Sequence, residues 1–165
     1  MLRHGEDFQK AWSEEAEMTL KIFRKLTDAA LTRKVAPEGR SLGKLAWHLV
    51  VSLHMVSEAG LPIDAPTDDI PVPAKVQDII AAYEKGAASV RAQVLKHWSD
   101  AALLEEVPMY GEQWAKGFVL WAMILHQTHH RAQMTVLMRQ AGLQVPGAYG
   151  PAREEWAAMN MPAPE

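Results

Sequence analysis

The sequence predicts an all-α protein: a four-helix bundle with one long crossover loop and a short helical tail at its C-terminal end. Apolar residues recur at helical spacing in four long segments. No segment keeps the period-two alternation of a strand. A proline-rich stretch, residues 61–74, separates the second helical segment from the third. The 165 residues suit one domain, residues 1–165, which is long enough to bury a core.

The first helical segment is predicted from about Glu6 to Arg33. Its apolar face also carries Glu15, which is an unusual place for a carboxylate. The second segment opens at Ser41, a suitable N-cap, and ends at Gly60. These boundaries leave a short connection between the first two helices.

The third helical segment is predicted from about Lys75 to Trp98, and the fourth from Gln113 to Ala141, just before a glycine. The fourth is apolar on two sides. Its first stripe contains Trp114, Phe118, Trp121, Leu125, Ala132 and Val136, and its second contains Val119, Met123, His126, His130 and Leu137. One stripe can face the bundle, and the other needs a cover, either the C-terminal tail or a second subunit. We therefore predict a homodimer in which this helix contributes to the interface.

Two further segments are irregular. The crossover, Leu61 to Ala74, contains four prolines and cannot be regular structure. Its pattern does not decide whether Pro62–Pro73 forms a lid or a plain connection. The tail from Val145 is rich in proline and glycine, with one short helical turn at Arg153–Met159.

Composition limits the class of protein. The chain has no cysteine, which excludes disulfides, a zinc–thiolate site and a cysteine nucleophile within it. A net charge of −3 with scattered Lys and Arg shows no footprint for nucleic acid. The longest apolar run, Gly117–Leu125, is far shorter than the ~20 residues that span a bilayer. The acidic N-terminal residues do not resemble a signal peptide. We expect a cytoplasmic protein without a membrane segment.

Histidines carry the main chemical signal. His126 and His130 are four residues apart in the fourth helical segment, so they lie on the same face. His48 lies in the middle of the second segment. Two ligands at helical spacing and one from a neighbouring helix can build a three-histidine metal site. The alternatives are ordinary: such a pair is often a surface or capping pair, and a lone half-buried histidine often only hydrogen-bonds in the core.

The spacing matches that of the zinc-protease pattern H-E-x-x-H, but Gln127 stands in place of the glutamate. Glutamine cannot act as a general base, which argues against a peptidase. Of the other histidines, His54 is expected at the surface or at an interface. His4 and His97 have no chemical partners around them in the sequence.

Four runs of sequence follow one another along the chain: LAWHL at 45–49, HQTHHRAQM at 126–134, LMRQAG at 137–142, and VP through YG at 145–150. In order and spacing they resemble the DinB/YfiT-like superfamily, over most of the chain. The most specific piece is H-x-x-H-H-R-x-Q. Where many members have glycine after the arginine, this chain has Ala132, which does not touch the ligand positions.

The resemblance implies a four-helix bundle, often dimeric, that holds a divalent metal ion through His48, His126 and His130. Nickel and zinc would both suit the family. Three imidazoles leave a coordination position open, where an ion can lower the pKa of water or hold a thiol as thiolate. Some relatives are thiol transferases or thiol-dependent isomerases. Because this chain lacks cysteine, a low-molecular-weight thiol would have to be a cosubstrate.

Three residues are candidates for supporting roles at the metal. Gln133 can orient a ligand, or it can be a polar residue at the mouth of the bundle. Glu15 can be a support or a general base, or a carboxylate at a helix edge. His129 can assist or simply pack. Arg131 projects away from the ligand pair, which favours a salt bridge or helix packing. No residue stands out as a positioned acid or base, and the catalytic residues stay undetermined.

Three functions fit the sequence. The first is a metal-dependent enzyme, a small-thiol transferase or a hydrolase, whose substrate the sequence does not identify. The second is a non-catalytic metal-binding stress-response protein. The third is an interaction protein that uses exposed aromatic residues such as Trp47 and Trp114.

Overall fold

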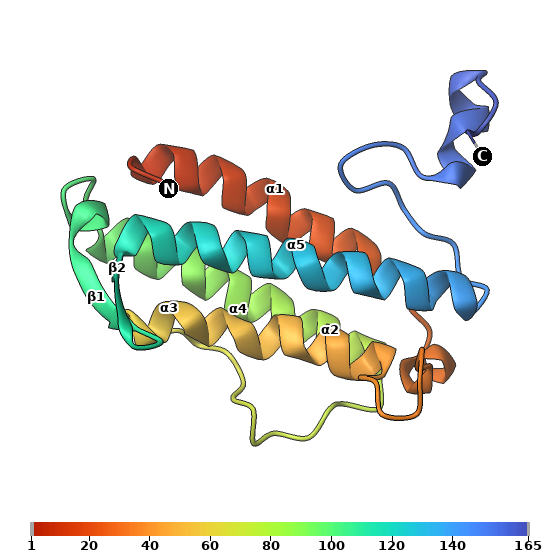
Figure 1. Cartoon of the computed structure of the whole chain (residues 1–165), viewed down its shortest axis with the longest axis horizontal. Helices are drawn as coiled ribbons and strands as arrows, with labels where there is room; N and C mark the ends of the chain where they lie inside the picture. Colours follow the sequence, from red (N-terminus) through yellow and green to blue (C-terminus); the bar gives the residue numbers. More distant parts are fainter. Residues whose placement is uncertain (1, 165) are drawn as a thin grey trace.

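The computed structural model describes residues 2–164 and is built around four long helical segments that lie side by side, the first and last running in one direction and the middle two in the opposite direction (Figure 1). The helices are α1 (Gly5–Phe23), α2 (Leu42–Val51), α3 (Met55–Glu58), α4 (Val76–His97) and α5 (Lys116–Gln140). Short 3₁₀ turns occur at η1 (Asp28–Thr32), η2 (Ser52–His54), η3 (Ala102–Leu104) and η4 (Arg153–Met159). The predicted helical bundle, its crossover and its helical tail are confirmed. No helix among these residues is long and apolar enough to cross a membrane.

The first predicted helix is shorter in the structure, because α1 ends at Phe23 and the chain turns into η1. The carboxylate of Asp28 accepts a hydrogen bond from the backbone N–H of Val76 at 2.8 Å, and it pairs with Lys75 at 3.0 Å. Asp28 thus satisfies a free N–H at the start of α4. A helix that continued to Arg33 would remove this long-range cap.

The second predicted helix is three consecutive pieces: α2, the turn η2, and α3. Its predicted cap is confirmed, since the Ser41 hydroxyl accepts from the backbone N–H of Lys44 at 3.1 Å. At the other end, Gly60 has a φ of +98°, which ends the segment as expected.

A β-hairpin precedes α5, so the expectation that the chain has no strands is wrong. Strands β1 (Glu106–Met109) and β2 (Glu112–Ala115) pair antiparallel. The turn residues Tyr110 and Gly111 have φ values of +51° and +84°, as a two-residue hairpin turn requires. Because β2 occupies the predicted start of the fourth helix, α5 begins at Lys116 instead.

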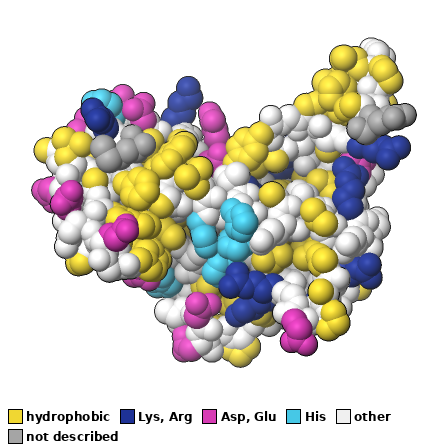
Figure 2. Space-filling view, in the orientation of Figure 1, with side chains coloured by type: hydrophobic (Ala, Val, Ile, Leu, Met, Phe, Trp, Pro, Cys, Tyr) yellow, Lys and Arg dark blue, Asp and Glu magenta, His cyan; other side chains and the backbone are white. Residues whose placement is uncertain are grey.

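The two apolar stripes of α5 have different environments. The stripe with Val119, Met123 and Leu137 is buried in the core. The other stripe is largely exposed; its members include Phe118, Trp121, Leu125 and Val136, at 37%, 37%, 49% and 53% exposure. Hydrophobic side chains are visible on this face of the molecule in Figure 2. The C-terminal tail leaves these side chains exposed, although η4 is joined to the helices by ion pairs of Glu154 with Arg139 on α5 and of Glu155 with Lys21 on α1.

The crossover between α3 and α4 is held against the bundle. The indole N–H of Trp47 donates to the backbone oxygen of Ile70 at 3.0 Å, and the imidazole of His54 contacts the backbone oxygen of Ala65 at 2.8 Å. Trp47 is only 2% exposed. The expectation that Trp47 is an exposed aromatic residue is therefore wrong, because the crossover covers it.

Candidate metal centre

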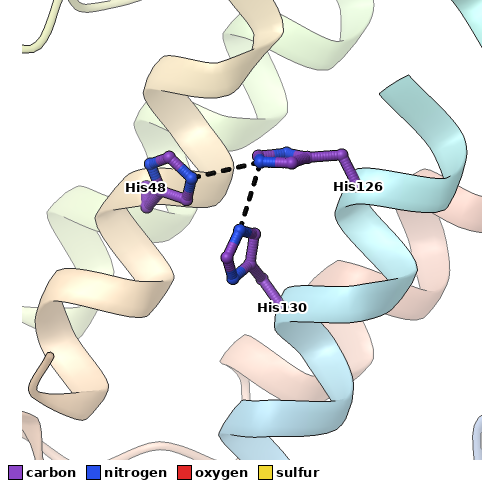
Figure 3. Close-up of side chains that lie close together, drawn as sticks. All are labelled: His48, His126 and His130. Carbon is purple, nitrogen blue, oxygen red and sulfur yellow. Dashed lines mark hydrogen bonds between the residues drawn. The ribbon is translucent and has the colours of Figure 1, made fainter. Parts of the chain in front are cut away.

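Three imidazoles from two helices converge between α2 and α5 (Figure 3). His48 projects from α2, and His126 and His130 project from α5. The Nε2 atom of His126 lies 3.3 Å from Nε2 of His48 and 3.1 Å from Nε2 of His130. One ligand nitrogen from each histidine can be chosen so that all three lie within 4.8 Å of one another. The structure thus brings together the three residues predicted as ligands.

Local structure explains this convergence. His126 and His130 are one helical turn apart on α5. Gln127, between them, is fully buried and bonds to the backbone oxygen of Leu49 on α2. That bond fixes α2 beside α5 one residue from His48. The third imidazole is therefore positioned by helix packing rather than by chain spacing.

Hydrogen bonding sets the orientation of His130. Its Nδ1–H donates to the side-chain oxygen of Gln133 at 2.8 Å, which leaves Nε2 with a free lone pair facing His126. The amide nitrogen of Gln133 in turn donates to Nε2 of the exposed His129 at 3.1 Å. Both residues predicted to support the site on α5 are thus linked to a ligand position.

The three imidazoles are neutral at neutral pH. Burial, followed by the charge of His130, lowers the pKa of His48 to about 4. Burial, followed by the charges of the other two histidines, lowers the pKa of His126 to about 4. Burial also lowers the pKa of His130. Neutral imidazole is the form that binds a metal ion.

This donor set fits a divalent ion. Two nitrogens at ~2.0–2.1 Å from a tetrahedral ion lie roughly 3.3–3.4 Å apart, close to the separations of His126 from its two neighbours. The buried Nδ1 of His126 has no hydrogen-bond partner among residues 2–164. Nε2 of His130 presents a lone pair to His126. One proton on Nε2 of His126 can form a hydrogen bond to only one of its two neighbours, Nε2 of His48 or Nε2 of His130. A cation at their centre accepts all three lone pairs at once.

A cavity of about 220 Å³ adjoins two of the imidazoles. Its wall includes His48 and His126, the acidic residues Glu58 and Asp68, and Tyr110 at the tip of the hairpin. Asp68 belongs to the crossover, so the crossover forms part of the wall. Sequence periodicity could not place Asp68 and Tyr110 in this wall, since they come from the crossover and the hairpin turn rather than from the helices.

Glu15 has partners other than the histidines. Its carboxylate accepts hydrogen bonds from the guanidinium of Arg131 and from the hydroxyl of Tyr149, the latter at 2.6 Å. Arg131 is 2% exposed and also donates to Thr19 at 2.9 Å. The preference for a salt bridge at Arg131 agrees with these contacts. The cluster ties α1, α5 and the C-terminal tail together.

The remaining histidines lie apart from the centre. His54 bonds to the crossover and lines the same cavity without joining the three-histidine group. His4 pairs with Asp100 at 2.9 Å on the surface, and this partner raises the pKa of His4. The sequence pattern identifies Gln127 only as a residue that cannot act as a protease base, and it misses the role of Gln127 in joining two helices; its position between two inward-facing histidines is the signal that could have shown that it is buried.

Comparison with known proteins agrees with the fold. The DinB family profile matches residues 1–165. YrdA of Bacillus subtilis (strain 168), an uncharacterised protein, is 43% identical over 167 residues, which cover 100% of this chain and 99% of YrdA.

Two solved structures share the fold. A DinB-like protein from Bacillus cereus ATCC 10987 has a TM-score of 0.87 and 38% identity, over 90% of this chain and 100% of that one. The DinB-like protein YjoA of Bacillus subtilis has a TM-score of 0.67 and 14% identity, over 88% of this chain and 99% of that one; it supports the fold alone. With its whole length matched by the family profile and a close relative, the chain belongs to the DinB family.

Proposed function

We propose that this protein is a metal-dependent enzyme in which His48, His126 and His130 hold one divalent ion, nickel or zinc. The reaction is the transfer of a small thiol to an electrophile, or a hydrolysis. The observation that carries the proposal is the convergence of three neutral imidazoles beside a cavity. A bound ion would supply Lewis-acid chemistry, polarising a substrate group or favouring the deprotonated form of a thiol or water.

The chain's own residues prepare this centre. Gln133 holds the proton on Nδ1 of His130, so that Nε2 stays available as a ligand atom. Gln127 holds α2 against α5. The absence of cysteine means that a reacting thiol must come from a cosubstrate. A low-molecular-weight thiol therefore belongs among the first molecules to test.

The cavity favours a catalytic role over a purely structural one. Structural zinc sites are usually closed by four protein ligands. Among residues 2–164, the metal-ligand group contains three histidines and no fourth His, Asp or Glu. The cavity beside His48 and His126 gives a small molecule access to the remaining position. A non-catalytic metal-binding stress protein would not need this access.

Metal content per chain, measured by mass spectrometry on untagged protein purified without chelators, tests the proposal. We expect about one nickel or zinc ion per chain. His48→Ala, His126→Ala and His130→Ala should each lose the ion, whereas His97→Ala should keep it. Loaded protein should then be assayed with small thiols and electrophiles. Equal metal retention by all four variants would overturn the assignment, and metal binding without turnover would favour the stress-protein alternative.

We also propose that the protein is a cytoplasmic homodimer without a nucleic-acid partner. The exposed apolar stripe of α5 supports self-association, because it presents Phe118, Trp121 and Leu125 together on one face. The net charge of −3 agrees with the absence of a nucleic-acid partner, and the lack of cysteine agrees with a cytoplasmic location.

Light scattering at micromolar concentration tests the dimer. Wild-type protein should have twice the monomer mass, and Trp121→Glu should be monomeric. Leu95→Glu is the matched control, because Leu95 is a 44% exposed apolar residue on α4. A monomeric wild type would exclude this dimer.

A further inference from the structure

A second pocket, of about 450 Å³, lies on the other side of the three-histidine centre. Its wall includes His130 and Gln133, whereas the first cavity is lined by His48 and His126. The histidines thus stand between two pockets. Figure 2 shows histidine side chains gathered at the surface near the middle of this face, with Lys and Arg side chains directly beside them.

The two pockets differ in charge. The first contains the acidic residues Glu58 and Asp68 and no Lys or Arg. The second contains Arg40 and no Asp or Glu. An anion therefore meets repulsion on one side of the centre and attraction on the other.

Arg40 is available to a ligand. It is exposed, and among residues 2–164 it forms no ion pair or side-chain hydrogen bond. It lines the same pocket as His130 and Gln133, so its positive charge lies beside the three-histidine centre. A guanidinium without a protein partner can form a bidentate pair with a carboxylate or phosphate.

Apart from Arg40, His130 and Gln133, the side chains of the pocket wall are apolar. Leu45 and Leu137 are buried at its base, while Val35 and Val136 are 65% and 53% exposed. Apolar walls with one charged group are typical of pockets for small organic ligands. The exposed valines would lose contact with water when such a ligand binds.

We infer that this pocket binds an organic anion, with Arg40 pairing with the anionic group and Val35, Leu45, Val136 and Leu137 holding a short hydrocarbon body beside His130. The inference rests on the proposed function, since it identifies this anion as the substrate or cosubstrate of the metal centre. Arg40 is a specificity residue in this arrangement. The acidic first cavity receives the uncharged or cationic end.

Binding of hexanoate and of its neutral analogue hexanamide tests the inference. The full-length chain is titrated with each probe at low ionic strength, in metal-free and zinc-loaded form, and followed by ¹H–¹⁵N NMR. In both forms hexanoate should bind about tenfold more tightly than hexanamide, the gain of one charge-assisted pair. Backbone signals of Val35 and Leu45 should shift.

Arg40→Gln should remove the preference for hexanoate while leaving metal content unchanged. Val35→Asp should weaken hexanoate more than hexanamide, because both probes lose an apolar contact and the new carboxylate repels only the anion. Arg91→Gln is the matched control, because Arg91 is exposed on α4 and lines a separate pocket; it should keep the preference in full.

Two results would overturn the inference: equal affinity for the two probes in wild type, or a preference that Arg40→Gln retains. A preference seen only with zinc, and unaffected by Arg40→Gln, would make the ion the anion receptor and would likewise overturn it. The proposed metal function can fail independently of the anion pocket. A chain that takes up no metal but still prefers hexanoate through Arg40 would support the pocket and refute the metal centre.

Discussion

The side-chain nitrogen of Gln127 donates a hydrogen bond to the backbone oxygen of Leu49 at 2.9 Å. The same nitrogen lies 3.1 Å from the hydroxyl of Ser52, and the amide oxygen accepts from the hydroxyl of Tyr83 at 3.1 Å. One fully buried amide between two histidines therefore joins α2, η2, α4 and α5. The position that carries the general base in H-E-x-x-H peptidases holds the bundle together in this protein.

Gln127→Glu, which restores the peptidase pattern, should destabilise the protein and give no peptidase activity. A carboxylate would face the Leu49 oxygen with an acceptor where a donor is needed, at a cost of about 2–3 kcal/mol. Urea unfolding measures the change. Gln77→Glu, at an exposed position on α4, should stay within about 0.5 kcal/mol of wild type. Equal stability of the two variants would contradict the structural role.

Gln133→Ala should weaken metal binding by about 10–100-fold, because His130 loses the acceptor that fixes its ring. Gln133→Glu keeps an acceptor and should retain most of the affinity. Competition with a chromogenic chelator measures the affinity. Gln140→Ala, at an exposed position near the end of α5, serves as the control. Unchanged affinity in Gln133→Ala would show that helix packing alone orients His130.

Glu15→Ala should lower the free energy of unfolding by about 3 kcal/mol, because it leaves the buried Arg131 charge without its carboxylate partner. Glu14→Ala, one residue away at an exposed position, should change stability by less than about 0.5 kcal/mol. Metal content should be normal in both variants. Loss of metal from Glu15→Ala, in a folded protein, would instead assign Glu15 to the metal centre.

The metal-free protein should lose stability as the pH falls from about 6.5 towards 4. Burial lowers the pKa of His48 and His126 to about 4 in the folded chain, while an unfolded histidine titrates near 6.5. Between these values the unfolded chain binds more protons, so protonation favours unfolding. The pH dependence is absent above this window.

Thermal unfolding of chelator-treated protein between pH 7.5 and 4.5 measures this dependence. His48→Gln should flatten it, and His97→Gln should leave it unchanged. The same slope in wild type and His48→Gln would rule out the cluster as its source.

Local patterns predicted those parts of the fold that depend on neighbouring residues. Helical periodicity located the long helices, and Ser41 was a recognisable cap. The hairpin escaped prediction because each strand has four residues and β1 contains Pro108. The early end of α1 depends on Asp28 capping a helix that begins 48 residues later, which no local pattern reveals.

The candidate site also contains some residues that local patterns predict and others that only the tertiary structure reveals. His126 and His130 were predictable from their spacing, and Gln133 from its place one turn further on. Glu15 and Arg131 were each noticed alone, but their pairing spans 116 residues and only tertiary structure reveals it. Arg40 and Tyr110 come from connecting segments, whose positions periodicity cannot predict.

The crossover is anchored by Trp47 and His54 and contributes Thr67 and Asp68 to the wall beside His48. It carries none of the three histidines and none of the helix contacts that position them. Substitutions at 67–68 can therefore change which molecules reach the centre while the ligands and the core stay the same. The helices therefore determine the reactivity, and the crossover is the part whose side chains can change to admit a different substrate.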